Sequence, residues 1–116
     1  MSNKLVIYHY SRCRKSRDGL RYLVENKLPH TVHDYMNHAL TQQDLRNILL
    51  KLNKKAYEIV RTDDPYYKKE LKNKQFTDDE WLTIILEQPS LLVRPIVVAK
   101  HKAVIAIPPD KIDGLL

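Results

Sequence analysis

Residues 5–17 of the chain read Leu5-Val6-Ile7-Tyr8-His9-Tyr10-Ser11-Arg12-Cys13-Arg14-Lys15-Ser16-Arg17. The apolar, β-branched start of this segment predicts a short strand. Behind it, Leu20, Leu23 and Val24 recur at helical spacing over residues 16–26, and Lys27-Leu28-Pro29 ends that helix. Residues 31–35 are β-branched and aromatic, which predicts a second strand. A strand, a helix and a strand within about 35 residues have the size of a βαβ unit.

The middle of the chain is predicted to be helical. Thr41 followed by Asp44, and Thr77 followed by Glu80, form the sequence pattern of a capping box, which begins a helix. A short basic helix is expected over residues 66–72, strands over 94–99 and 103–107, and a last short helix over 110–116. We therefore predict one α/β domain over residues 1–116 with a thioredoxin-like fold, in which a four-stranded mixed sheet carries a helical insertion over about residues 41–90.

Composition restricts the possible partners. A chain of 116 residues supports one core, and its net charge of +6 favours anionic partners. No aromatic residues interleave the basic ones in a way that suggests a base-stacking surface, so the sequence gives only weak support to nucleic acid binding. No apolar run approaches the ~20 residues that span a bilayer, and the N-terminus lacks the layout of a signal peptide, so no membrane is expected. A free thiol fits a reducing compartment, which predicts a cytoplasmic protein.

Cys13 is the only cysteine, and basic residues surround it at Arg12, Arg14, Lys15 and Arg17. Cations and a helix N-terminus both favour the thiolate, which is the nucleophilic form. A free cysteine can also be a small buried hydrophobe, but such a thiol would not need this run of basic residues. Position 16 is serine, so the chain has no Cys-x-x-Cys pair and no internal thiol that could resolve a disulfide.

Several further motifs, taken in order, resemble the ArsC-type arsenate reductase family, which also includes Spx-like transcription regulators. They are Ile7-Tyr8-His9 before Cys13, Ser16-Arg17 after it, Val60-Arg61-Thr62, Phe76-Thr77-Asp78-Asp79 and Leu92-Val93-Arg94-Pro95-Ile96-Val97-Val98. The resemblance covers nearly the whole chain. It implies a nucleophilic Cys13 thiolate, oxyanion binding by Arg61 and Arg94, and a cis peptide bond before Pro95. Forked guanidinium groups suit an oxyanion such as arsenate.

The resemblance also implies a reaction sequence. The Cys13 thiolate attacks arsenic, glutathione attacks the adduct and releases arsenite, and glutaredoxin resolves the mixed disulfide by thiol exchange. Glutathione is thus the expected co-substrate and glutaredoxin the expected partner. No bound cofactor is expected, and the histidines and Cys13 do not show a recognised metal-ligand spacing.

Other residues near Cys13 keep two interpretations each. His9 could stand beside the thiolate as an imidazolium, or be solvated or bonded to the backbone. Ser16 could donate to the sulfur or cap the helix. Arg17 could serve the site or cover the helix surface, and Arg14 or Lys15 could supply a missing positive charge.

Three positions depart from the family pattern. Tyr10-Ser11 stands where many members have Asn-Pro, Lys15 stands where threonine is common, and Ile107 stands where arsenate reductases have a third arginine. Ile107 leaves open a member that reduces another electrophile or a mixed disulfide. A Spx-like regulator that binds RNA polymerase is the other alternative, although those proteins usually carry a Cys-x-x-Cys switch.

Overall fold

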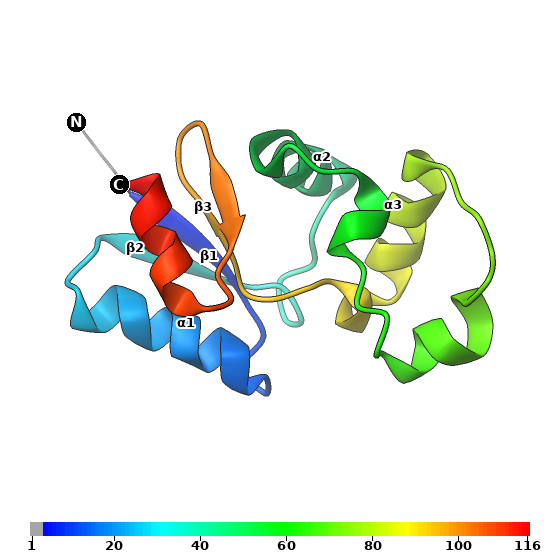
Figure 1. The fold of residues 1–116 in the computed structure, drawn as a ribbon, viewed down its shortest axis with the longest axis horizontal. Coiled ribbons are helices and arrows are strands. Elements are labelled where there is room, and N and C mark those ends of the chain that lie inside the picture. The colour runs from blue at the N-terminus through cyan, green and yellow to red at the C-terminus, as the bar shows by residue number, and fades with distance from the viewer. Residues whose placement is uncertain (1–3) are drawn as a thin grey trace. The chain divides into compact units, whose positions relative to one another are not determined.

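The computed structural model describes residues 4–116 (Figure 1). In chain order its elements are β1 (Leu5–His9), α1 (Arg14–Glu25), β2 (His30–Asp34), α2 (Gln42–Leu52), η1 (Ala56–Ile59), η2 (Tyr67–Leu71), α3 (Asp78–Glu87), η3 (Pro89–Leu91), β3 (Ile96–Val98), β4 (Ala103–Ile105) and η4 (Pro109–Leu115). The prediction that the N-terminus lacks the layout of a signal peptide concerns Met1, Ser2 and Asn3 first, and these three lie outside the described residues.

The chain forms two compact units. The sheet unit contains the residues up to His38 together with Arg94–Leu116, and the helical unit contains Ala39–Val93. The helical unit occupies the part of the chain where the sequence predicts an insertion over about residues 41–90. Among residues 4–116, none of the helices has the length and apolar character that a bilayer crossing requires.

The sheet has four strands in the order β2-β1-β3-β4. Strand β1 runs parallel to β2, while the pairs β1–β3 and β3–β4 are antiparallel. Ile7 and Val97 are partners at the centre of the sheet, and both side chains are fully buried. The predicted mixed sheet, with one parallel half and one antiparallel hairpin, is therefore confirmed.

The core of the sheet unit lies between the sheet and the helices α1 and η4. Leu5 and Ile7 point to the same side of β1 because side chains alternate along a strand. They pack with Leu23 of α1 and Ile112 of η4. The two helices are also joined by a hydrogen bond that the Tyr22 hydroxyl donates to the Asp113 carboxylate at 2.6 Å. This packing places the N-terminal end of α1 beside the end of β1.

A glycine in α1 permits a close approach to Pro95. A Cβ atom at Gly19 would lie 2.7 Å from the Pro95 Cγ atom and 3.7 Å from the Ile7 Cδ1 atom. The first of these distances is shorter than van der Waals contact, so a larger residue would force α1 and Pro95 apart. Gly19 therefore sets the separation between the cysteine-bearing helix and the segment that begins at Arg94.

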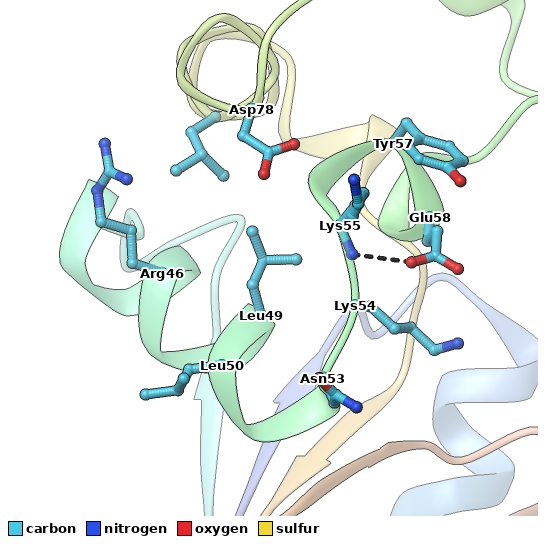
Figure 2. A pocket seen from close by; sticks show the side chains of 10 residues that line it. Arg46, Leu49, Leu50, Asn53, Lys54, Lys55, Tyr57, Glu58 and Asp78 are labelled. Carbon is cyan, nitrogen blue, oxygen red and sulfur yellow. Dashed lines mark hydrogen bonds between the residues drawn. The ribbon is translucent and has the colours of Figure 1, made fainter.

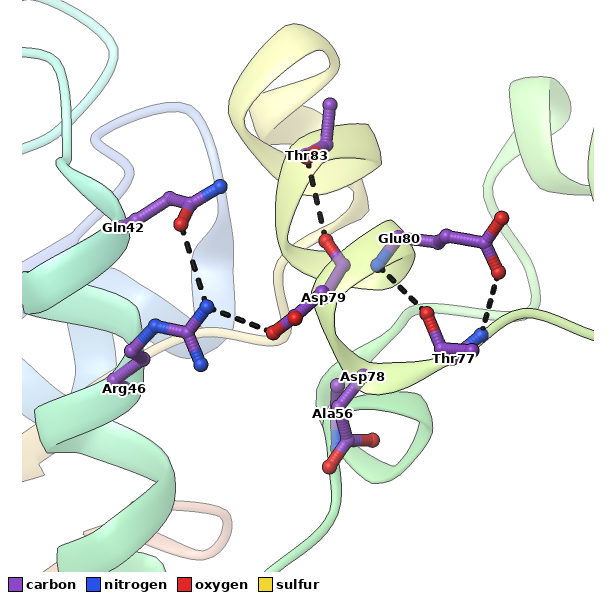
Figure 3. Close-up of polar contacts among 8 residues, drawn as sticks. All are labelled: Gln42, Arg46, Ala56, Thr77, Asp78, Asp79, Glu80 and Thr83. Atoms are coloured by element: carbon purple, nitrogen blue, oxygen red, sulfur yellow. Dashed lines mark hydrogen bonds and ion pairs between the residues drawn. The ribbon is translucent and has the colours of Figure 1, made fainter.

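Both predicted capping boxes are present in the helical unit. The Thr41 hydroxyl accepts a hydrogen bond from the Asp44 backbone N–H at 3.1 Å, and the Asp44 carboxylate accepts from the Thr41 N–H at 2.9 Å. Thr77 and Glu80 make the same reciprocal pair at 3.2 and 2.8 Å (Figure 3). These bonds satisfy backbone donors that a helix start otherwise leaves without partners.

A salt bridge also connects the helices α2 and α3 of this unit. The Arg46 guanidinium lies 2.7 Å from the Asp79 carboxylate at the start of α3 (Figure 3). The pair is largely exposed, so its contribution to stability is small, about 0–1 kcal/mol. The buried core of this unit includes Leu45 and Ile48 of α2 and Leu82 and Ile85 of α3.

A cavity of the helical unit has a volume of about 630 Å³. Its lining residues are Arg46, Leu49, Leu50, Asn53, Lys54, Lys55, Tyr57, Glu58, Asp78 and Leu82 (Figure 2). None of the predicted site residues is among them.

Several element boundaries differ from the predictions by one or two residues: β2 covers His30–Asp34 rather than 31–35, and β4 ends at Ile105 rather than at 107. Strand β3 begins at Ile96 rather than at 94, because Pro95 has no N–H to donate to a strand partner. The helix expected over 66–72 is a single π-helical segment, Tyr67–Leu71, closed by a hydrogen bond from the Lys72 N–H to the Tyr67 carbonyl. Helix α1 begins at Arg14, two residues before its predicted start.

Candidate active site

Cys13 is the N-cap residue of α1, in the turn between β1 and the helix. Its backbone N–H donates to the Tyr10 carbonyl at 3.0 Å, and its own carbonyl accepts from the Arg17 N–H at 3.0 Å. The thiol is half-buried. The turn therefore holds the sulfur at the positive end of the α1 dipole, where an anion is favoured.

Opposing influences act on the pKa of the Cys13 thiol. Burial is the largest and raises the pKa, because it disfavours the charged form. The Arg94 guanidinium lowers it by hydrogen bonding to the sulfur and by its charge, and the backbone N–H groups of Ser16 and Lys15 lower it further. These two N–H groups face the sulfur without forming a side-chain cap hydrogen bond to it. The net pKa is below the usual value, and the thiolate is favoured.

The source of the positive charge differs from the one inferred from the sequence. The side chains of Arg14, Lys15 and Arg17 are exposed, where water screens their charges. Lys15 acts on the pKa of Cys13 through its backbone N–H, and the cation that acts is Arg94. The flanking basic residues are therefore not the main electrostatic partners of Cys13.

Arg94 is a buried cation, with 8% of its surface exposed. Its guanidinium carbon lies 4.5 Å from the centroid of the Tyr10 ring. The peptide bond between Arg94 and Pro95 is cis, as the resemblance implied, and the Ile107–Pro108 bond is also cis, which the sequence did not predict. Pro95 contacts α1 at Gly19, so the segment carrying Arg94 packs directly on the helix that Cys13 begins.

Ser16 and His9 form a buried pair beside Cys13. The Ser16 Oγ atom lies 2.7 Å from His9 Nδ1 and accepts a hydrogen bond from the Tyr10 N–H at 3.0 Å. Since Cys13 is the N-cap, Ser16 does not cap the helix; its hydroxyl instead ties the helix to the end of β1. The Ser16 hydroxyl has one proton, and a neutral His9 ring can accept it at Nδ1.

His9 is 6% exposed, and burial lowers its pKa, while the Asp34 carboxylate opposes this shift. The neutral ring is therefore favoured at pH 7. This state does not supply the imidazolium that the sequence analysis considered beside the thiolate.

Arg17 lies on the surface and contacts the turn before Cys13. It is exposed, and its Nη1 atom donates to the Ser11 carbonyl at 2.9 Å. Arg14 is exposed at the first helical position after Cys13. Of the two interpretations of Arg17, the surface one describes its position in the structure, with an added contact to the turn.

Arg61 belongs to the helical unit, where several groups hold it. Its Nη1 atom donates to the Ser90 carbonyl at 2.9 Å, and its guanidinium lies 3.5 Å from the Asp63 carboxylate and 3.4 Å from that of Asp64. Its side chain is 24% exposed. An oxyanion that used Arg61 would therefore share it with two carboxylates.

Tyr10 is a residue whose importance was not inferred from the sequence. Its ring contacts the Arg94 guanidinium, and the centroid of the Tyr35 ring is 6.5 Å away. In the sequence, Tyr10 stands out only as a departure from the family pattern. No local signal could have revealed the contact, because Tyr10 and Arg94 are far apart along the chain.

The groups gathered in the sheet unit are thus a thiol at a helix N-terminus, a buried guanidinium and a serine–histidine pair. They can hold a thiolate and present N–H donors to an anion. In residues 4–116, no group of three or more His, Cys, Asp and Glu side chains is placed to hold a metal ion.

Comparisons with known proteins agree on one family. A model of the ArsC family matches residues 8–115. The arsenate reductase of Neisseria meningitidis is 34% identical over 115 residues, which cover 97% of this chain and 98% of that protein. The global transcriptional regulator Spx 1 of Lactococcus lactis is 30% identical over 111 residues, 95% of this chain and 87% of that protein.

A solved structure gives the same result for the fold. The arsenate reductase from Vibrio cholerae matches with a TM-score of 0.91 at 28% identity, and the match covers 100% of both chains. The predicted thioredoxin-like α/β fold is therefore confirmed.

Proposed function

As the chain belongs to the ArsC family, we propose that it is a thiol-dependent oxidoreductase that reduces arsenate, or a similar oxyanion, through Cys13. The observation that carries this proposal is the position of Cys13, which lies at the start of α1 and beside the buried Arg94 guanidinium. Both neighbours favour the thiolate, and the pKa of the thiol is lowered. The arsenate reductase relatives, at similar length, support arsenate as the substrate.

In the proposed reaction, the Cys13 thiolate forms a bond to the arsenic atom of arsenate, and a protonated arsenate oxygen leaves as water. The thiolate of glutathione then attacks the Cys13 sulfur, and the electron pair of the S–As bond passes to arsenic. Arsenic is reduced from As(V) to As(III) and leaves as arsenite, while the two sulfurs are oxidised to a mixed disulfide. Thiol exchange with glutaredoxin restores Cys13.

Four residues besides Cys13 have roles in this scheme. Arg94 holds the thiolate and, together with the backbone N–H groups at the start of α1, binds the oxyanion. The family resemblance implies Arg61 as a further oxyanion ligand, while Ser16 and Pro95 maintain the shape of the turn and of the Arg94 segment.

The electron donor must come from outside the chain, because Cys13 is its only cysteine. Glutathione and glutaredoxin are therefore proposed as co-substrate and partner, and the cytoplasm as the location where such donors keep thiols reduced.

Two other functions each have a specific observation in their favour. The similarity to Spx 1 favours a transcription regulator that binds RNA polymerase. Ile107, at the position where a third arginine is expected, favours a member that reduces another electrophile or a mixed disulfide. Against the regulator, this chain lacks the Cys-x-x-Cys switch that Spx-like proteins usually carry. A member with another substrate would use the same Cys13 chemistry that is proposed above.

The test is arsenite release by the purified protein supplied with arsenate, glutathione and glutaredoxin. We expect turnover by the wild type and a loss of at least 100-fold in Cys13→Ser, because the serine hydroxyl is not ionised at neutral pH and cannot form the mixed disulfide. A wild type with a reactive thiol but no arsenite release would contradict arsenate as the substrate. Retention of RNA polymerase on immobilised protein, equally by wild type and Cys13→Ser, would favour the regulator.

A further inference from the structure

We propose that Tyr10 is a positioning residue, whose ring holds the Arg94 guanidinium with an N–H edge towards the Cys13 sulfur. This inference rests on the proposed function, since it assigns a role in preparing the Cys13 nucleophile. It concerns a position at which this chain departs from the family pattern.

The distance between the two groups is that of a cation–π contact. The Arg94 guanidinium carbon is 4.5 Å from the Tyr10 ring centroid, and such contacts act within about 6 Å. The attraction strengthens when the cation is removed from water. Arg94 is 8% exposed, so this contact is largely shielded from solvent.

The shape of the guanidinium explains why a ring is an effective support. Its N–H donors all lie in one plane, so a group that needs hydrogen bonds must approach an edge. An aromatic ring against the flat face uses none of these donors. Tyr10 can therefore restrain Arg94 without competing for the hydrogen bond that Arg94 makes to the Cys13 sulfur.

Tyr10 is itself firmly placed. Its N–H donates to the Ser16 hydroxyl at 3.0 Å, and its carbonyl accepts from the Cys13 N–H at 3.0 Å. On the side of β2, its ring meets Tyr35, which is 1% exposed, with 6.5 Å between centroids. Tyr10 thus contacts the turn around Cys13 through its backbone and Arg94 through its ring.

The test uses the rate of Cys13 alkylation by iodoacetamide as a function of pH, which reports one thiol because the chain has one cysteine. Tyr10→Leu keeps an apolar side chain but removes the aromatic face. We expect its titration midpoint to rise and its thiolate fraction below the midpoint to fall by about 3- to 10-fold, the scale of a partly desolvated cation–π contact. Tyr10→Phe keeps the ring and should titrate like the wild type.

A second background shows whether Tyr10 acts through Arg94. When Arg94→Ala is already present, Tyr10→Leu should produce no additional shift, because the cation that the ring holds is gone. Circular dichroism and thermal unfolding of each variant establish that it folds. An unchanged midpoint in a folded Tyr10→Leu, or an equal shift with and without Arg94, would overturn the inference while leaving the proposed function in place. A wild-type thiol that titrates like free cysteine would overturn both.

Discussion

The Arg94 guanidinium reaches Cys13 from a segment far along the chain, and it does so as a buried group. A cation in that position is poorly screened, whereas the exposed cations next to Cys13 are surrounded by water. The effect of a charge on the thiol pKa therefore depends on burial and direction more than on sequence proximity. His9 illustrates the same rule in reverse, since burial favours its neutral form.

The contrast between the buried Arg94 and the exposed cations next to Cys13 can be measured by replacing one cation at a time. Arg94→Ala should raise the midpoint of Cys13 alkylation, because it removes both the hydrogen bond and the charge that favour the thiolate. Arg94→Lys should raise it less, since lysine keeps the charge but loses the planar fork. Arg12→Ala is the matched control: Arg12 is exposed and adjacent to Cys13, and its removal should have a small effect. A larger shift in Arg12→Ala than in Arg94→Ala would restore the interpretation based on flanking cations.

At the level of elements, the site depends on how closely α1 approaches the segment before β3. Gly19 faces Pro95 across this contact, and no other residue type would fit without movement. The glycine costs α1 about 1 kcal/mol of helix propensity relative to alanine. Its presence in the middle of the helix is explained by packing, which outweighs the local preference.

Gly19→Ala should therefore destabilise the protein, although alanine is the better helix former. We expect a loss of about 1–3 kcal/mol in the free energy of unfolding, the usual range for overpacking. The chain offers a matched control in Gly114→Ala, because nothing lies within 4 Å of a Cβ atom at that position. Urea denaturation of both variants checks the expectation. Equal stabilities for the two variants would show that α1 and Pro95 can move apart at little cost.

At the level of the whole molecule, ionisation of Cys13 is coupled to folding. The folded thiol has a lowered pKa, while the thiol of the unfolded chain titrates near pH 8.5, as in model peptides. A group whose pKa is lowered by folding contributes stability that is fully present above its unfolded pKa and is lost as the pH falls through the folded pKa.

The wild type should consequently gain stability relative to Cys13→Ser as the pH rises from 6 to 9. Serine does not ionise in this range, so the variant removes only the contribution of the thiolate and leaves the other titrating groups in common. Urea denaturation of both proteins at several pH values, under reducing conditions, measures the difference. A difference that stays constant, or that shrinks as the pH rises, would mean that folding does not favour the thiolate.

The amino-acid order was enough to predict most of the elements and their sequence along the chain. Capping boxes at Thr41 and Thr77 and the alternation in β1 depend on neighbours within a few residues, so they can be read locally. The mixed sheet follows from the order of these elements. Boundaries were less accurate at Pro95 and in η2, where a missing donor and a π-helical hydrogen bond change the local pattern.

The electrostatics of Cys13 depended instead on the folded chain. The position of the thiol could be predicted, because one cysteine begins one helix. Which cation acts on it, the neutral state of His9 and the ring beneath Arg94 could not, since each involves packed groups that the chain brings together from distant positions. The physical reason is that hydrogen bonds and burial act over a few ångströms of space, whereas sequence patterns describe only distance along the chain.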